Sequence, residues 1–132
     1  DLNLARKLLK HLRNLELQLF TWKIKLYAFN WVKVFESKFR SSYVDTEKIS
    51  KSRDNVVFWT LTDYGNNNNL SSISKFNVNC LEGKKTHLYF SYYHEPMGKG
   101  RKVSEDEWEK SVYPKPNSEA YDLMIFACNH EK

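Results

Sequence analysis

The sequence predicts an α+β domain in which an N-terminal amphipathic helix packs on a mostly antiparallel sheet of five or six strands. The sheet either stays open or curls into a partial barrel. Two observations lead to this class. Apolar residues recur at helical spacing near the N-terminus, and several β-forming runs separated by turn residues follow after residue 55. The chain has 132 residues, an ordinary length for one domain, so we expect a single unit over 1–132.

The first expected element is a helix over residues 3–14. Its apolar face is formed by Ala5, Leu8, Leu9, Leu12 and Leu15. Arg6, Lys10 and Arg13 lie on the opposite side, which makes the helix amphipathic and basic. We expect the leucines to cover the sheet of the same domain. A membrane surface or the groove of a partner is the alternative for such a helix.

Residues 16–40 fit two patterns. Apolar and polar residues alternate over 17–28, which is typical of a half-buried strand, but a helical face fits the same stretch. The β-branched and aromatic content favours a strand. Residues 31–39 are then either a second strand or the end of one long helix, because neither Gly nor Pro separates the two segments.

Three later runs have the composition of strands. These are 56–62, 73–81 and 86–93, and the last two form a predicted hairpin because Gly83 lies in the short link between them. The preceding stretch, 41–54, is polar and is predicted to be a loop with at most one helical turn.

The C-terminal third is predicted to hold one short helix and one strand. Ser104 followed by Glu107 is a capping-box pattern, which predicts a helix over 105–112. Pro114 would end it. The apolar run from Tyr121 to Cys128 is predicted to be the last strand.

The two cysteines occupy apolar faces of predicted strands. Cys80 lies in the first strand of the predicted hairpin and Cys128 lies in the last predicted strand. A disulfide between them is therefore expected, with two buried free thiols as the alternative. The bond would close a loop of about 48 residues, and a disulfide across a loop of that length stabilises the fold by about 4 kcal/mol. A disulfide would place the protein in an oxidising compartment, and we therefore expect a secreted protein.

No arrangement typical of catalysis or metal binding occurs in the sequence. The four histidines, at positions 11, 87, 94 and 130, lack H-E-x-x-H spacing, and C-x-x-C is absent. No G-x-S-x-G nucleophile motif and no phosphate-binding P-loop is present. We therefore expect a protein that is not an enzyme, with no catalytic residue, no metal and no cofactor.

The positive charge is concentrated at the N-terminus. Residues 1–40 hold nine basic and three acidic residues, a net charge of +6, while 41–132 hold twelve and thirteen, a net charge of −1. Such asymmetry is an argument about partners. The candidate residues for binding an anion or an acidic partner are Arg6, Lys10, Arg13, Lys23 and Lys25.

Aromatic side chains are the candidate binding residues of the sheet. Several strands are apolar on both faces, so a bound ligand or a partner is expected to cover one of them. The expected wall residues are Trp59, Tyr89, Phe90, Tyr92 and Tyr93.

The function predicted first is a small secreted, non-enzymatic binding protein that holds either an apolar or aromatic small ligand or a protein partner. The alternative is an intracellular protein that uses the basic segment 1–40 to bind nucleic acid or to join a larger assembly. No apolar run is long enough for a transmembrane helix.

Overall fold

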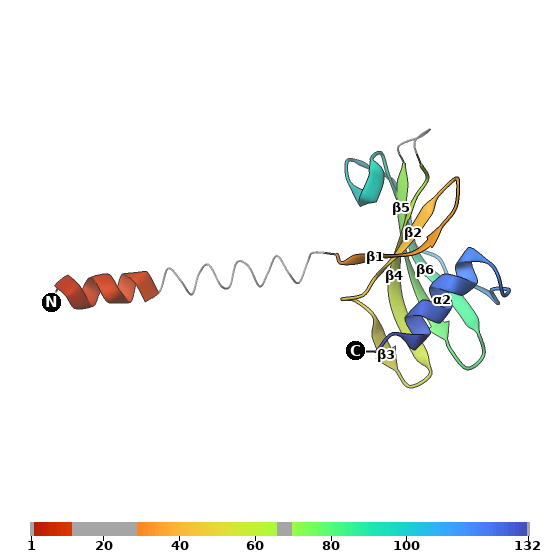
Figure 1. Cartoon of the computed structure of the whole chain (residues 1–132), viewed down its shortest axis with the longest axis horizontal. Helices are drawn as coiled ribbons and strands as arrows, with labels where there is room; N and C mark the ends of the chain where they lie inside the picture. The colour runs from red at the N-terminus through yellow and green to blue at the C-terminus, as the bar shows by residue number, and fades with distance from the viewer. Residues whose placement is uncertain (1, 12–28, 66–69, 132) are drawn as a thin grey trace.

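A computed structural model describes residues 2–11, 29–65 and 70–131. Its main feature is one open, antiparallel, eight-stranded sheet with strand order β1-β2-β4-β5-β6-β7, in which β3 pairs with β4 and β8 pairs with β6 (Figure 1). The strands are β1 (Trp31–Glu36), β2 (Ser41–Asp45), β3 (Ser50–Ser52), β4 (Asn55–Asp63), β5 (Ser71–Asn79), β6 (Lys84–Tyr93), β7 (Lys102–Asp106) and β8 (Lys110–Val112). A 3-10 turn, η1 (Pro96–Gly98), and a C-terminal helix, α2 (Glu119–Asn129), complete the domain.

The predicted α+β class with a mostly antiparallel sheet is confirmed, and the sheet is open rather than closed into a barrel. The strands β4, β5 and β6 lie where the β-forming runs predicted them. The β5–β6 hairpin is present, and Gly83 in its turn has a φ of +70°, which favours glycine. Segment 31–39 contains strand β1, in agreement with the strand alternative.

Two predictions about polar segments are wrong. The predicted loop 41–54 contains β2 and β3, because the small side chain of Ser42 can be buried in β2 beside Thr62, whose hydroxyl lies 3.2 Å away. The predicted helix over 105–112 is instead the end of β7 and the strand β8, both of which pair with β6. Pairing with an existing strand outweighs the capping-box signal there.

The predicted strand from Tyr121 to Cys128 is also wrong, because this run forms α2. Ser118 caps the helix by accepting a hydrogen bond from the backbone N–H of Tyr121 at 3.2 Å. Leu123, Met124 and Ala127 are buried, and this spacing fits one helical face. A short apolar run of this kind does not distinguish a strand from a buried helix.

The core lies between α2 and one face of the sheet, where α2 packs against β1, β2 and β4 (Figure 1). The buried residues of this cluster are Val44, Ile49, Val56, Phe58, Phe76, Val78, Leu123, Met124 and Ala127. The side of β6 is covered less by the helix, and this determines where the hollows described below lie.

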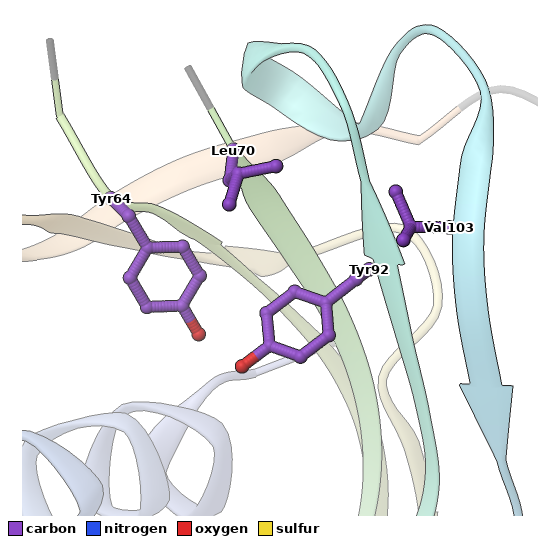
Figure 2. Close-up of a pocket in the computed structure, with 4 residues that line it drawn as sticks. All are labelled: Tyr64, Leu70, Tyr92 and Val103. Carbon is purple, nitrogen blue, oxygen red and sulfur yellow. The ribbon is translucent and has the colours of Figure 1, made fainter. Parts of the chain in front are cut away.

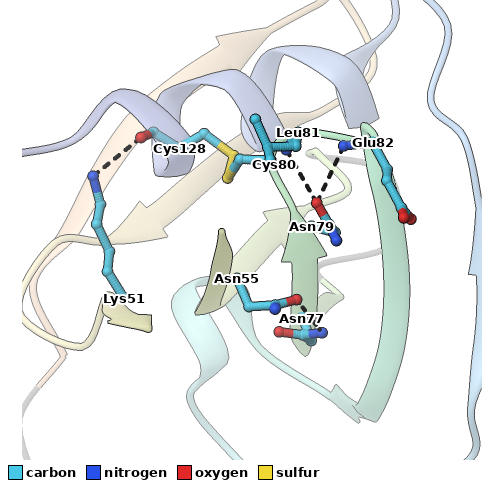
Figure 3. Close-up of a disulfide and its surroundings, with 8 residues drawn as sticks. All are labelled: Lys51, Asn55, Asn77, Asn79, Cys80, Leu81, Glu82 and Cys128. Carbon is cyan, nitrogen blue, oxygen red and sulfur yellow. Dashed lines mark hydrogen bonds between the residues drawn. A yellow bond between two sulfur atoms is a disulfide. The ribbon is translucent and has the colours of Figure 1, made fainter. Parts of the chain in front are cut away.

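A disulfide fastens the C-terminal end of α2 to the sheet, as Figure 3 shows. It joins Cys80, directly after β5, to Cys128 in the last turn of α2. Lys51 of β3 donates a hydrogen bond to the backbone carbonyl of Cys128 at 3.0 Å. The predicted pair is therefore bonded, although Cys128 lies in a helix and not in a strand.

At the N-terminus, residues 2–11 form the expected helix. Its described residues are all exposed, with Leu2 76% and Leu9 65% accessible to solvent. The helix that packs on the sheet is thus α2, at the other end of the chain. The predicted strand over 17–28 lies outside the described residues. No helix in the described part of the chain is long and apolar enough to cross a membrane.

Candidate functional site

A row of aromatic and lysine side chains lies on the sheet face opposite α2. Trp59 of β4 is the register partner of Lys75 in β5, and Lys75 is the partner of Tyr89 in β6. Neighbouring strand residues point to opposite faces. Phe58 and Phe76 belong to the core beneath α2, so Trp59 and Lys75 point away from it. We call Phe29, Trp31, Trp59, Lys75 and Tyr89 the aromatic–lysine row.

Ring contacts connect the row from β1 to β6. The rings of Phe29 and Trp31 are stacked with centroids 4.7 Å apart, and Phe29 meets Trp59 edge-on at 6.3 Å. Trp59 in turn meets Tyr89 edge-on at 5.6 Å. The Nζ of Lys75 lies 5.4 Å from the Trp59 ring centre, within reach of a cation–π contact. These side chains form one continuous surface with a positive charge at its centre.

An exposed ion pair holds the Tyr89 end of the row in place. The Tyr89 hydroxyl donates to Glu105 Oε2 at 3.0 Å, and Lys102 Nζ lies 2.6 Å from the same oxygen. The hydrogen bond to Glu105 raises the pKa of Lys102, and the bond from Lys102 lowers the pKa of Glu105. Both groups are therefore charged at neutral pH, and they fix the position of the Tyr89 hydroxyl.

The η1 turn covers the other part of this face. The backbone N–H of Met97 donates to Asp63 Oδ1 at 2.8 Å, and that of Gly98 donates to Ser71 Oγ at 2.9 Å. Beneath the turn, Leu61 and Ile73 are buried. The row borders this covered region, so only one part of the face is open to a partner.

On the α2 side, a hollow of about 340 Å³ is lined by Tyr64, Leu70, Tyr92 and Val103 (Figure 2). The rings of Tyr64 and Tyr92 lie 6.1 Å apart, and the Tyr64 hydroxyl is 2.9 Å from Ser72 Oγ. Burial raises the pKa of Tyr64. The Tyr64 hydroxyl therefore stays protonated at neutral pH.

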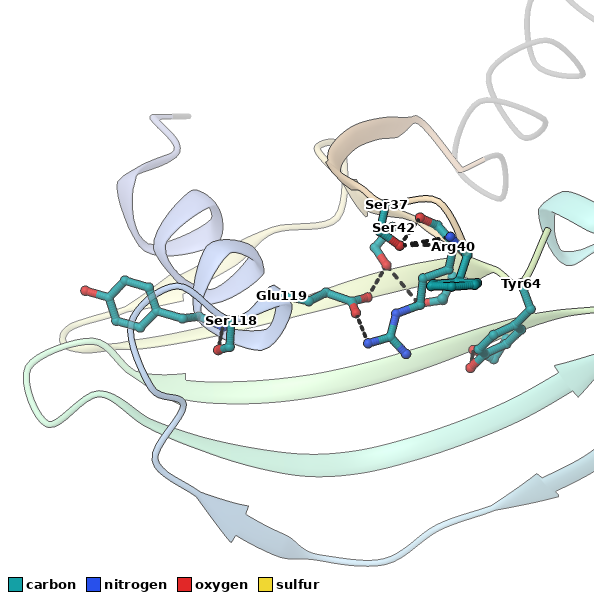
Figure 4. A network of polar contacts seen from close by, with 10 residues as sticks. Ser37, Arg40, Ser42, Tyr64, Ser118 and Glu119 are labelled. Atoms are coloured by element: carbon teal, nitrogen blue, oxygen red, sulfur yellow. Dashed lines mark hydrogen bonds and ion pairs between the residues drawn. The ribbon is translucent and has the colours of Figure 1, made fainter.

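A polar network borders the next hollow, beside the first turn of α2 (Figure 4). Arg40 and Glu119 form an ion pair at 2.5 Å, and Ser42 Oγ donates to the same carboxylate. The guanidinium and the carboxylate neutralise one another, and their contact holds the start of α2 against β2.

The structure divides the predicted wall residues between the two faces. Trp59 and Tyr89 belong to the aromatic–lysine row, whereas Tyr92 and Phe90 line hollows on the α2 side. Tyr93 pairs with Ser71 and Lys102 next to the η1 turn. The sequence did not predict Phe29, Trp31 and Lys75 as members of the row. They come to lie beside Trp59 and Tyr89 through the pairing of distant strands, which the local sequence pattern does not show.

The predicted basic residues are placed only in part. Arg6 and Lys10 are exposed on the N-terminal helix. Arg13, Lys23 and Lys25 lie outside the described residues. Within residues 2–11, 29–65 and 70–131, no group of three or more His, Cys, Asp or Glu side chains could hold a metal ion.

These features define a class: a small α+β domain with an open antiparallel sheet, one face of which presents aromatic rings. Residues 31–129 match the family described as Surface-adhesin protein E, and the chain belongs to that family. The fold is similar to that of protein E from Haemophilus influenzae in several crystal structures.

In crystal form II of that protein, the similarity has a TM-score of 0.60 at 16% identity and covers 74% of this chain and 86% of the other. The selenomethionine form gives 0.59 at 17% identity, covering 76% and 87%. These likenesses show the fold. A search among curated proteins gave no match.

Proposed function

We propose that this protein is a non-enzymatic surface protein that binds a protein partner through the aromatic–lysine row. Membership of the Surface-adhesin protein E family supports a role in binding at a surface. The disulfide between Cys80 and Cys128 supports a location outside the reducing cytosol, in line with the predicted secretion. The single observation behind the choice of site is the unbroken set of ring contacts across the open face.

The composition of the row suits a protein interface. Trp and Tyr are enriched among the residues that contribute most to binding, because they bury a large area with few rotatable bonds. Trp31, Trp59 and Tyr89 are half-buried, so their positions are already fixed before a partner arrives. Lys75 adds one charge in the centre of the row, which favours an acidic group on the partner.

The extent of the row favours a macromolecular partner over a small ligand. The row runs from β1 to β6, and the sheet order between them includes β2, β4 and β5. Four strand spacings amount to about 19 Å. A surface of that length is wider than most small molecules. Binding of nucleic acid by the basic segment 1–40 stays a prediction, and a protein partner has the support of the family.

Attachment to cells tests this proposal. Fluorescent beads coated with the full chain are incubated with cultured epithelial cells, and bound beads are counted. The Trp59→Ala/Tyr89→Ala double variant should reduce attachment at least tenfold, because two interface aromatics are lost. Treating the cells with trypsin beforehand should also abolish attachment, because the partner is a protein.

The matched control is Tyr113→Ala. Tyr113 is 64% exposed and takes no part in the row. This variant should attach like the wild type. Unchanged attachment of the double variant, with a native circular dichroism spectrum, would contradict the choice of site. Full attachment to trypsin-treated cells would contradict a protein partner.

A further inference from the structure

A second cavity of about 390 Å³ lies between the first turn of α2 and the sheet, on the face opposite the aromatic–lysine row. Its volume is within the range of pockets that hold small organic molecules, about 300–1,000 Å³. It is lined by Arg40, Thr60, Thr62, Tyr64, Ser72, Ser74, Phe76, Lys85, Phe90, Ser118, Glu119, Ala120 and Leu123. The lining therefore combines hydroxyl groups, aromatic rings and two cationic side chains.

One of the two cations is already neutralised. Arg40 is paired with Glu119 at 2.5 Å, and the same carboxylate accepts a hydrogen bond from Ser42. Within the described part of the chain, Arg40 and Glu119 thus leave no net charge in the cavity.

Lys85 is the cation that has no such partner. The residue is only 9% exposed, and its ammonium group forms none of the side-chain hydrogen bonds or ion pairs seen among the described residues. Its Nζ lies 4.1 Å from the centre of the Phe76 ring, a cation–π contact that compensates only part of the lost hydration. Burial lowers the pKa of Lys85, and the charge of Glu119, which lies beyond ion-pair distance and is paired with Arg40, offsets only part of this effect. A buried ammonium group without an ion-pair partner is costly, so an anion bound beside it would be favourable.

Hydroxyl groups that line the same cavity as Lys85 can donate to such an anion. Thr60 and Ser74 are cross-strand partners, and both are buried in the wall of the cavity. Ser74 also faces Phe90 in the register of β6. An ammonium group and two hydroxyls would give a carboxylate three donors, while Phe76, Phe90 and Leu123 provide apolar contacts for the group attached to it.

We propose that this cavity binds a carboxylate attached to an apolar group, with Lys85 as its counter-ion and Thr60 and Ser74 as hydrogen-bond donors. A single unpaired cation matches a single negative charge, which favours a carboxylate over a doubly charged phosphate. The carboxylate can belong to a small organic acid or to the C-terminus of a peptide. This site lies on the other face of the sheet from the aromatic–lysine row and is independent of the proposed function.

Isothermal titration calorimetry at pH 7 with the full chain tests this proposal. The probes are 3-phenylpropionate and its neutral analogue 3-phenylpropanamide. The acid should bind at least tenfold more tightly than the amide, because the amide lacks the charge that compensates Lys85. Equal affinity for the two probes would overturn the proposal.

Substitution of Lys85 gives the second arm. Lys85→Met keeps a similar length without the charge and should weaken binding of 3-phenylpropionate at least tenfold. Lys75→Met, on the opposite face, is the control and should bind the acid like the wild type. Wild-type affinity in a folded Lys85→Met variant would overturn the proposal. If that variant does not fold, Thr60→Val replaces it, because valine preserves the shape of the threonine side chain. Thr60→Val should weaken binding of 3-phenylpropionate several-fold, and unchanged affinity would also overturn the proposal.

Two peptide probes identify the source of the carboxylate. Acetyl-Gly-Phe with a free C-terminus and the same peptide as its amide are titrated under the same conditions. Binding of the free acid alone would assign the site to peptide C-termini as well as small acids. If 3-phenylpropionate binds and neither peptide does, the site takes small acids only. Lys85→Met should leave bead attachment to cells unchanged, so the two proposals can fail separately.

Discussion

Phe58 and Trp59 are neighbours in β4, yet Phe58 is fully buried beneath α2 and Trp59 is half-exposed on the opposite face. Both faces of the sheet present aromatic rings. Phe58 packs beside Phe76 with centroids 5.8 Å apart, and Trp59 meets Tyr89 at 5.6 Å. The difference between the faces is therefore what covers them, and not the kind of residue they contain.

The elements that cover each face explain why one face forms the core and the other is open for binding. The first face is covered by α2, whose ends are held by the disulfide at Cys128 and by the pair of Glu119 with Arg40. On the second face, the covering element within residues 2–11, 29–65 and 70–131 is the short η1 turn. Core packing thus accounts for the rings under α2. The rings of the aromatic–lysine row have no such cover among the described residues and are available for binding.

The largest expected effect is a comparison between the two neighbours. Phe58→Ala should lower the free energy of unfolding by about 3–5 kcal/mol, because it leaves a cavity in the core. Trp59→Ala should cost no more than about 2 kcal/mol, because its ring is partly solvated in the folded state. Urea denaturation of both variants gives the two values. Equal losses would show that the second face is as tightly packed as the first.

Removal of the disulfide should have the next largest effect. The Cys80→Ser/Cys128→Ser variant should lose about 2–4 kcal/mol, because the bond closes a loop of 48 residues and fixes the end of α2. Urea denaturation again measures the free energy of unfolding, and the reduced wild type is measured for comparison. A variant as stable as the oxidised wild type would mean that packing alone holds α2 in place.

Two glycines with the same φ of +70° test the cover of the second face. A Cβ at Gly98 would lie 2.8 Å from Ile73 Cδ1, whereas one at Gly83 would meet nothing within 4 Å. Gly83→Ala should therefore cost about 1 kcal/mol for its backbone conformation alone. Gly98→Ala should cost up to about 3 kcal/mol, because overpacking is added. Thermal unfolding measures the loss of stability in the two variants. Equal losses would show that η1 adapts to the added methyl group without strain.

The comparison of faces also explains which parts of the fold the sequence could predict. The β5–β6 hairpin depends on local signals, since Gly83 lies between two β-forming runs. The segment from Tyr121 to Cys128 forms a helix because its buried residues pack on a sheet that local pattern does not describe. For β7 and β8, pairing with β6 decides the structure, and the capping-box pattern at Ser104 does not.

The candidate sites also contain features that local sequence predicts and features that depend on strand pairing. Cys80 and Cys128 could be paired from their apolar surroundings alone, even though one of the two elements was misassigned. Trp59 and Tyr89 could be selected as aromatic strand residues. Their contact, with Lys75 between them, depends on the register of three strands, and a one-residue shift would move each side chain to the other face.

The smallest expected effect concerns His87, at the edge of the face that α2 covers only in part. Its ring lies 4.8 Å from Phe76 and 4.6 Å from Trp108, and its Nε2 is 3.0 Å from the carbonyl oxygen of Tyr89. Burial lowers the pKa of His87 below its usual 6.5. The neutral ring is therefore the form that the folded state favours.

The sign of the resulting pH dependence follows from proton binding. As the pH falls below about 6.5, the unfolded chain binds a proton at His87 that the folded chain does not, so the free energy of unfolding decreases. His87→Phe keeps an aromatic ring without a titrating group, and it should lose less stability than the wild type between pH 7.5 and pH 5. Urea denaturation at both pH values measures this difference. Identical losses of stability in the variant and the wild type would mean that the His87 ring is as well solvated in the folded chain as in the unfolded one. This edge of the sheet would then be as open to solvent as the face that carries the aromatic–lysine row.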